Sequence, residues 1–474
     1  MLTGHFRRVR TFVLGLAFGA AGVVGPLATS APVTAAVVAP HPLIAHHITL
    51  SNRISQGPPT TAECRLQGFS CYQPFQFQKA YNLGPLYEDG FNGRGRTIVI
   101  VDSFGSPTIK ADLHAFDQAF NLPDPPSLRI IAPAGPVNFD NTNSDQLGWA
   151  GETTLDVEWS HSMAPGANIL LVETPVSETE GVQGFPEMML SENFVINHNM
   201  GDVISQSFGA TEETFPNVQS LLSLRSAFKN AAAHHVAVLA SSGDFGATDA
   251  KLDLSCCYAQ QVVDWPSSDP LVTSIGGTQL HLDDTGNRLA PDNVWNDGFA
   301  ATGGGPSHVF SRPHFQNPVR NVVGNHRGLP DISMSGACDG AVDVYSTFDA
   351  NPANNGWGLV CGTSESSPLF SGIVAIADQM AGHRLANLNN RLYNLLDQQP
   401  NGIVDVTTGN NTFTFCQANC RTPNRVLVTV QGFTAAPGYD MASGLGTLDA
   451  NRLVRALAEN DSQGDNGGNG GGGN

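Results

Sequence analysis

The sequence predicts an α/β protein built on a doubly wound, mostly parallel sheet flanked by helices. Two observations lead to this prediction. Short apolar runs bounded by turn residues recur along the chain and read as buried strands. Longer segments with helical spacing of apolar residues lie between them. Strands that alternate with helices in this way are typical of a parallel sheet with helices packed on it.

The individual elements follow from the same patterns. The expected strands are 96–102, 127–132, 168–172, 202–209, 236–244 and 272–278. The expected helices are 75–83, 108–120, 152–162, 182–198 and 217–233, followed by an apolar helical run at 369–377. Because ligands of open parallel sheets bind at the carboxyl ends of the strands, polar residues at those ends are candidates for function.

The composition excludes some classes of protein. Hydrophobic residues make up 41% of the 474 residues, which is enough for a large core. The net charge of -19, from 42 acidic and 23 basic residues, argues against a nucleic-acid partner. The same charge suits a soluble protein that tolerates acid.

The N-terminus has the layout of a secretory signal peptide, expected over residues 1–36. An arginine-rich stretch at 7–10 precedes an apolar segment at 12–27, and small residues follow. Glycines and a proline make that segment a poor membrane-spanning helix. We therefore expect a secreted, extracellular protein with no membrane contact after the signal is removed.

Three further regions are expected. Residues 37–74, rich in Pro, His, Ser and Thr, are predicted to be a short, poorly ordered leader. Residues 75–458 are predicted to form the folded domain. Residues 459–474 are dominated by Gly and Asn toward the end and are predicted to be a flexible tail.

Eight cysteines fit an exported protein that contains disulfides. Cys64 and Cys71 are close in sequence and could close a small loop, and Cys416 and Cys420 form a second local pair. Connectivity cannot be read from sequence alone.

The other four cysteines lie in two places. Cys256 and Cys257 are adjacent, so we expect each to bond elsewhere rather than to the other. Cys338 and Cys361 remain, and a bond between them would pin the segment that leads into Ser364.

Ser364 stands in a glycine-led turn just ahead of an apolar run, in the sequence Cys-Gly-Thr-Ser-Glu-Ser-Ser-Pro. Near a helix N-terminus, free N–H groups and the helix dipole favour a neighbouring negative charge. One interpretation is a nucleophile. The other is an ordinary N-cap, because Ser and Thr are preferred there.

Three acidic residues are candidates to act with this serine. Glu152 and Asp156 are four residues apart and thus on one face of a helix, with Trp and Leu around them. The alternative for this pair is a solvated acidic face. Asp244 follows a strand in Ser-Gly-Asp-Phe-Gly, where the alternative is a turn-forming residue.

In this order and spacing, Glu152-x-x-x-Asp156, Ser242-Gly243-Asp244 and Gly362-Thr363-Ser364 with Pro368 resemble the sedolisins, the serine-carboxyl peptidases. The resemblance covers residues 75 to 458 and implies a subtilisin-like α/β fold. Further stretches agree with it: Ala164-Pro165-Gly166-Ala167, Trp265-Pro266-Ser267-Ser268, Gly276-Gly277-Thr278, Val294-Trp295-Asn296-Asp297, Gly303-Gly304-Gly305 and Leu329-Pro330-Asp331.

The resemblance implies a role for each candidate. Ser364 attacks the peptide carbonyl and forms an acyl-enzyme, Glu152 is its general base, and Asp156 orients Glu152. Asp244, protonated, donates to the oxyanion. Carboxyl groups in these roles suit acidic pH. The expected function is a secreted serine-type endopeptidase, a monomer acting on protein or peptide substrates.

Two other interpretations compete with this one. A subtilisin-like protease shares the sheet and the Gly-Thr-Ser turn, and Asp102 sits where its acid would. The histidine stretch that supplies its base is missing, however, since His161 lies in His-Ser-Met-Ala. We therefore interpret Asp102 as a supporting residue. From another class, the protein could be a catalytically silent relative that binds peptides or cell-surface material.

The resemblance also implies one structural Ca²⁺ near the C-terminus. The family site uses two aspartates and three backbone carbonyls, which here match Asp405, Val406, Ala436, Gly438 and Asp440. Oxygen-only ligation suits a hard cation such as Ca²⁺. The alternative is an Asp/Gly-rich turn without metal.

The sequence departs from the family pattern in two ways. The family usually carries a large N-terminal pro-domain, whereas few residues precede the expected domain here. Glu365 follows the nucleophile where the family usually has a small residue, and we expect it to alter the local field or the substrate side of the cleft.

Overall fold

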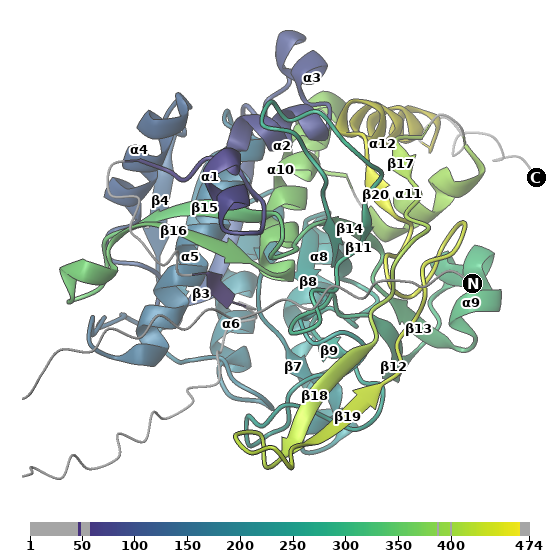
Figure 1. The fold of residues 1–474 in the computed structure, drawn as a ribbon. Helices are drawn as coiled ribbons and strands as arrows, with labels where there is room; N and C mark the ends of the chain where they lie inside the picture. The colour runs from purple at the N-terminus through teal and green to yellow at the C-terminus, as the bar shows by residue number, and fades with distance from the viewer. Residues whose placement is uncertain (1–45, 49–56, 386–387, 399–400, 465–474) are drawn as a thin grey trace, which may run out of the picture. The chain divides into compact units, whose positions relative to one another are not determined.

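The computed structural model describes residues 46–48, 57–385, 388–398 and 401–464 (Figure 1). The chain divides into two units, Met1–Val38 and Ala39–Asn474, and every described residue lies in the second. The signal peptide expected at 1–36 and the last ten residues of the expected tail lie outside the described residues.

The centre of the fold is an eight-stranded sheet. Seven strands follow the order β11-β10-β8-β6-β3-β5-β4, and β14 pairs with β10. Every pairing is parallel except that of β10 with β11. The mostly parallel sheet expected from the sequence is thus confirmed. Its strands are β3 (Thr97–Ser103), β4 (Leu128–Ile131), β5 (Asn168–Thr174), β6 (Val203–Gln206), β8 (Ala237–Ser241), β10 (Thr273–Gln279), β11 (Asn293–Val294) and β14 (Ile332–Ser335).

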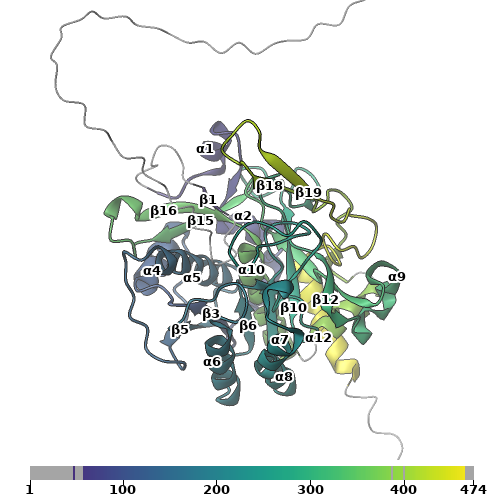
Figure 2. The same ribbon diagram turned by 90° about the horizontal axis from the view of Figure 1, so that it is seen from below.

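Helices cover both faces of this sheet. Alternate residues of β3 show the two layers: Ile98 and Ile100 join one apolar core, and Val99 and Val101 join another. Figure 2 shows α4, α5 and α10 on one side of β3 and β6, and α6 and α8 on the other. These helices are α4 (Ile109–Phe120), α5 (Ser144–Met163), α6 (Phe185–Asn197), α7 (Val218–Leu224), α8 (Ser226–Ala233) and α10 (Thr363–Ala381).

Several helices differ from their expected bounds. α5 begins at Ser144 rather than Glu152, because the Asn143 side chain accepts hydrogen bonds from the first backbone amides of the helix. The single helix expected over 217–233 is two helices, α7 and α8, which meet at Arg225.

Four smaller β-pairs and several further helices surround the sheet. The pairs are β7 (Ala210–Thr211) with β9 (Asp264–Trp265), β12 (Gly305–Ser311) with β13 (His326–Leu329), β17 (Ile403–Val404) with β20 (Thr447–Leu448), and β18 (Phe413–Ala418) with β19 (Val426–Val430). The helices are α2 (Pro74–Ala80), α3 (Gly84–Glu88), α9 (Arg320–Val323), α11 (Leu388–Asn394) and α12 (Ala450–Gly464). None of the helices in the described part of the chain has both the length and the apolar character needed to span a membrane.

Part of the segment assigned to the leader is built into the folded domain. Residues 57–74 carry helix α1 (Thr61–Leu66) and strand β2 (Cys71–Tyr72). β2 joins a four-stranded sheet in the order β1-β16-β15-β2, which contains β1 (His46–Ile48), β15 (Ala341–Ser346) and β16 (Gly356–Cys361).

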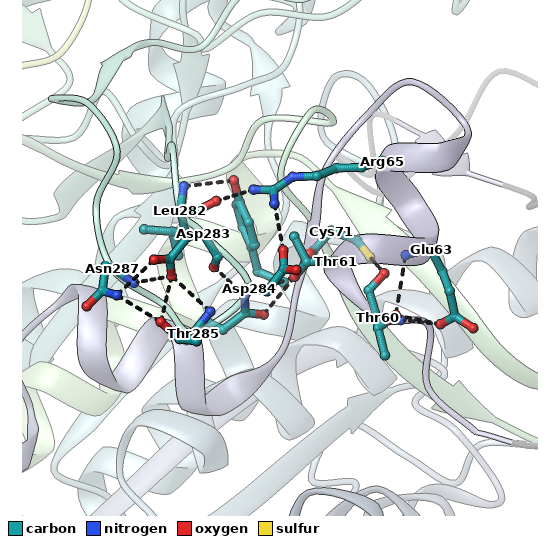
Figure 3. Close-up of polar contacts among 12 residues, drawn as sticks. Thr60, Thr61, Glu63, Arg65, Cys71, Leu282, Asp283, Asp284, Thr285 and Asn287 are labelled. Carbon is teal, nitrogen blue, oxygen red and sulfur yellow. Dashed lines mark hydrogen bonds and ion pairs between the residues drawn. The ribbon is translucent and has the colours of Figure 1, made fainter.

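Local bonds explain why this segment is ordered. A capping box between Thr60 and Glu63 starts α1. Figure 3 shows Arg65 of α1 paired with Asp284, at 2.6 Å between Nη1 and Oδ1, in the loop after β10. The composition of this segment gave no sign of the pairing of Arg65 with Asp284, whose partner lies more than 200 residues away in the chain.

All eight cysteines form disulfides, and no cysteine in the described ranges is free. The bonds are Cys64–Cys71, Cys256–Cys257, Cys338–Cys361 and Cys416–Cys420. The expectation that Cys256 and Cys257 each bond elsewhere is wrong. The other six cysteines pair among themselves, so these two adjacent thiols have only each other.

Candidate active site

The acidic pair predicted from the sequence lies on α5. Glu152 and Asp156 share one face of the helix, and both are fully buried. α5 packs closely against α10 at Gly372, where a Cβ atom would lie only 2.6 Å from the Cβ of Met163. The pair is therefore enclosed within the fold, and the solvated acidic face left open by the sequence is wrong.

Ser364 stands in the first turn of α10, directly after β16. Gly362, with a φ of 135°, occupies the N-cap position and turns the chain from strand to helix. Its amide donates to the Gly336 carbonyl at 2.8 Å, and the preceding Cys361 is bonded to Cys338. Since the cap is Gly362, the interpretation of Ser364 as an ordinary N-cap is wrong.

Asp244 reaches the same turn from the end of β8. Its Oδ1 accepts a hydrogen bond from the Thr363 amide at 2.7 Å and lies 2.8 Å from the Thr363 hydroxyl. The Gly243 amide in turn donates to that hydroxyl at 3.1 Å. Asp244 is 1% exposed, so it is a buried group beside the residue that precedes Ser364 rather than a surface turn former. In the sequence Thr363 stands out only as part of the Gly-Thr-Ser turn, which does not predict this contact.

The electrostatics of the acidic pair are dominated by burial. Burial raises the pKa of both Glu152 and Asp156 well above the ordinary carboxyl value, and the charge of Asp102 adds to the increase. The hydroxyls of Ser364 and Ser207 act in the opposite direction and lower the pKa of Glu152, although neither Glu152 oxygen has a hydrogen-bond partner within the described residues. Groups that interact this strongly share their protons and titrate together.

Asp102 is the third carboxyl of this cluster. It lies near the carboxyl end of β3 and is fully buried. Burial raises the pKa of Asp102 to about 7, and the charge of Glu173 adds to the increase. Its electrostatic effect on both Glu152 and Asp156 agrees with the supporting role that we gave it from the sequence.

His161, the one histidine weighed as a base, is engaged elsewhere. Its Nε2 lies 2.8 Å from the Pro123 carbonyl and 3.3 Å from Oδ1 of Asp117 on α4. Burial lowers the pKa of His161 to about 4. These contacts support the exclusion of an imidazole base.

Glu365, the unusual residue after Ser364, is also buried within the fold. Burial raises the pKa of this carboxyl well above its usual value, and the charge of Asp244 adds to that effect. The side chain therefore does not line a solvent-open cleft, and its influence on the site is electrostatic.

The five residues expected to hold calcium meet around one turn. Oδ2 of Asp405 accepts a hydrogen bond from the Gly438 amide at 2.9 Å, and Oδ2 of Asp440 accepts one from the Ala436 amide at 2.9 Å. Val406 follows Asp405 directly. The two carboxylates thus border the loop that carries the expected carbonyl ligands, an oxygen-only set that fits Ca²⁺. Within the described part of the chain, no three His, Cys, Asp or Glu side chains are grouped to hold a metal, so a metal here depends on main-chain carbonyls.

Comparison with known proteins identifies the family. The subtilase family matches residues 134–391, which is more than half of the chain. Kumamolisin from Bacillus sp. (strain MN-32) is 30% identical over 402 residues, covering 83% of this chain and 65% of kumamolisin. Sedolisin from Pseudomonas sp. (strain 101) is 28% identical over 371 residues, covering 77% of this chain and 58% of sedolisin. The chain belongs to the subtilase family, in its sedolisin branch.

A solved sedolisin supports the fold of this family member. The structure of Pseudomonas sedolisin (serine-carboxyl proteinase), complexed with two molecules of pseudo-iodotyrostatin, matches with a TM-score of 0.67 at 25% identity. The match covers 83% of this chain and 99% of that one. The subtilisin-like fold implied by the sequence is thus confirmed. The chain spans 65% and 58% of the lengths of the two curated relatives described above.

Proposed function

We propose that this sedolisin hydrolyses peptide bonds as a serine-carboxyl endopeptidase. One observation carries the proposal: Asp244 accepts a hydrogen bond from the amide of Thr363, directly before Ser364 in the first turn of α10, and Glu152 and Asp156 lie buried on α5, which packs against that helix. Three segments far apart in the sequence thus supply one serine and its acidic partners, all of them buried. The family membership supports the same reaction.

The proposed reaction begins when Glu152 takes the proton from Ser364 Oγ as Oγ attacks the carbonyl carbon. Asp156 orients Glu152. Asp244, through the proton on its carboxyl, and the Ser364 amide donate to the oxyanion of the tetrahedral intermediate. The intermediate collapses as the C–N bond breaks, and Glu152 gives its proton to the leaving amine. In deacylation Glu152 takes a proton from water as the water oxygen attacks the acyl carbon, and the proton passes to Ser364 Oγ when the C–Oγ bond breaks and the acid is released.

This chemistry requires acid. A carboxylic acid donates to an oxyanion only while it holds its proton, so Asp244 fails as the pH rises. A general base is present only while the buried cluster of Glu152, Asp156 and Asp102 holds at least one ionised carboxyl. In very strong acid none of the three is ionised. The rate of hydrolysis therefore has a maximum at an acidic pH and falls on either side of it.

The setting of the enzyme follows from its sequence and bonds. The expected signal peptide and the four disulfides support a secreted, extracellular protein. Its substrates in this proposal are proteins or peptides, and the enzyme acts as a monomer.

The test is a pH profile of proteolysis by the native chain. We expect initial rates of cleavage of an unfolded protein substrate to peak in acid and to fall by more than about 100-fold at pH 8. Circular dichroism at each pH identifies the range over which the chain is folded, and rates are compared within it. A flat profile, or a neutral optimum, contradicts the proposed mechanism. A folded chain that cleaves nothing at any pH supports a binding protein instead.

We also propose that one structural Ca²⁺ binds at Asp405, Asp440 and the carbonyls of Val406, Ala436 and Gly438. When bound, the ion supplies positive charge that holds the two carboxylates and the loop together. The convergence of both carboxylates on that loop supports this proposal.

Removal of calcium is expected to lower the melting temperature by about 5 °C or more, because the ion binds only the folded chain. The measurement is a thermal melt at constant pH with EGTA and with EGTA plus excess Ca²⁺. Asp405→Asn weakens the site and is expected to make the melt insensitive to added Ca²⁺. Identical melting temperatures for the native chain with and without chelator contradict the site.

A further inference from the structure

Ser207 contacts both halves of the proposed catalytic site. It follows β6 directly and is fully buried. Its Oγ donates to Oδ1 of Asp156 at 2.8 Å and lies 3.3 Å from the backbone carbonyl of Ser364. One hydroxyl therefore links the acidic pair of α5 to the first turn of α10.

The acidic pair that this hydroxyl contacts has further carboxyl groups near it. Asp102 approaches the pair from β3, and Asp244 approaches it from the loop after β8. On α10, the charge of Asp244 also raises the pKa of Glu365. The groups with the largest electrostatic effects on Glu152 and Asp156 are thus other carboxyls, with no basic side chain among them.

An ionised carboxylate in such a place needs hydrogen-bond donors, because burial and like charges both oppose its charge. Hydrogen bonds to a carboxylate are stronger than those between neutral groups. The Ser207 hydroxyl is such a donor to Asp156, and it also lowers the pKa of Glu152.

We infer that Ser207 is a positioning residue of the proposed catalytic site, whose hydroxyl stabilises the ionised acidic pair and aligns it with the first turn of α10. This inference rests on the proposed function. In other sites a positively charged side chain keeps a carboxyl ionised. Here the Ser207 hydroxyl does so, and a general base is therefore present in acid.

The inference sets a direction for the pH dependence. The Ser207 hydroxyl lowers the pKa of both Glu152 and Asp156, so its removal raises both. The acid limb of the activity profile reports ionisation of this pair, and it therefore moves to higher pH. The alkaline limb, which in the proposed mechanism reports loss of the proton on Asp244, stays close to its native position.

The experiment compares Ser207→Ala with Ser205→Ala. Ser205 lies on β6, two residues before Ser207, and is also fully buried. Its hydroxyl also contacts α10, at 2.9 Å from that of Ser367, and within the described residues Asp156 accepts its side-chain hydrogen bond from Ser207 and not from Ser205. Profiles of kcat and KM against pH are measured on one peptide substrate. Circular dichroism at each pH restricts the comparison to the range over which each variant is folded.

For Ser207→Ala we expect the acid limb to move up by about one pH unit and kcat to fall about tenfold, with KM little changed. Ser205→Ala is expected to keep the native profile, and Ser207→Thr, which retains the hydroxyl, to restore it. If Ser207→Ala does not fold, Ser207→Cys, with its weaker donor, replaces it and is expected to move the limb in the same direction.

Coincident acid limbs for native and Ser207→Ala enzyme overturn the inference, as does an equal shift in Ser205→Ala, which indicates a general packing effect. Failure of the proposed function is distinguishable from both, because the native chain then cleaves no substrate at any pH.

Discussion

Glu152→Gln is expected to reduce kcat by about ten-thousand-fold, and Ser364→Ala by at least as much. Glutamine keeps the shape of Glu152 but cannot take the proton from Ser364, so the serine stays a neutral hydroxyl and a poor nucleophile. In Ser364→Ala no acyl-enzyme can form. The measurement is kcat at the acidic optimum, with product analysis sensitive enough to detect residual hydrolysis.

A control on the same helix separates this effect from a general loss of buried charge. Glu158 is also fully buried on α5, but its oxygens accept a hydrogen bond from the Tyr345 amide at 3.1 Å, on the four-stranded sheet. Glu158→Gln is expected to retain activity within about threefold of the native chain. Equal losses in Glu152→Gln and Glu158→Gln would falsify the assignment of the base, and activity that survives Ser364→Ala would remove the nucleophile from the mechanism.

The parts of the site predicted from the sequence are those with a local signal. Glu152 and Asp156 are four residues apart, so helix geometry alone places them on one face. Ser364 and Asp244 each sit beside glycines that mark a tight turn. Because such patterns are contained in a few residues, they survive without knowledge of the fold.

The parts that were missed depend on contacts between distant segments. Ser207 contacts Asp156 and Ser364 across separations of 51 and 157 residues, and no pattern around Ser207 indicates either contact. Strand β2, within residues 57–74, likewise pairs with β15, about 270 residues away in the chain, and Arg65 pairs with Asp284. A polar residue at the carboxyl end of a parallel strand was the available signal for Ser207, but many residues share it.

The chain is expected to be more stable in acid than at neutral pH, with a melting temperature that falls by more than about 15 °C between pH 4 and pH 8. The cause is a set of buried carboxyls outside the catalytic site. Burial raises the pKa of Glu192 and of Asp117 to about 8, and raises that of Glu158 and Asp343 well above the usual range.

The direction follows from the linkage between protonation and folding. In the unfolded chain these groups release their protons near pH 4, whereas in the folded chain they hold them to a higher pH. The stability they contribute is complete below about pH 4 and is lost as the pH rises through the folded pKa. At roughly 1.4 kcal/mol per pKa unit, one such group loses several kcal/mol, which is comparable with the total stability of many domains.

Glu192 offers the sharpest test of this cause. Its Oε1 accepts a hydrogen bond from Gln206, and its Oε2 has no partner within the described residues, so Glu192→Gln keeps the bond and removes the titration. The variant is expected to narrow the difference in melting temperature between pH 4 and pH 8, mainly by raising the value at pH 8. The exposed Glu88→Gln is the matched control and is expected to leave that difference unchanged. A native chain whose melting temperature at pH 8 equals or exceeds that at pH 4 contradicts the expectation. Loss of protons from the buried carboxyls then does not destabilise the fold.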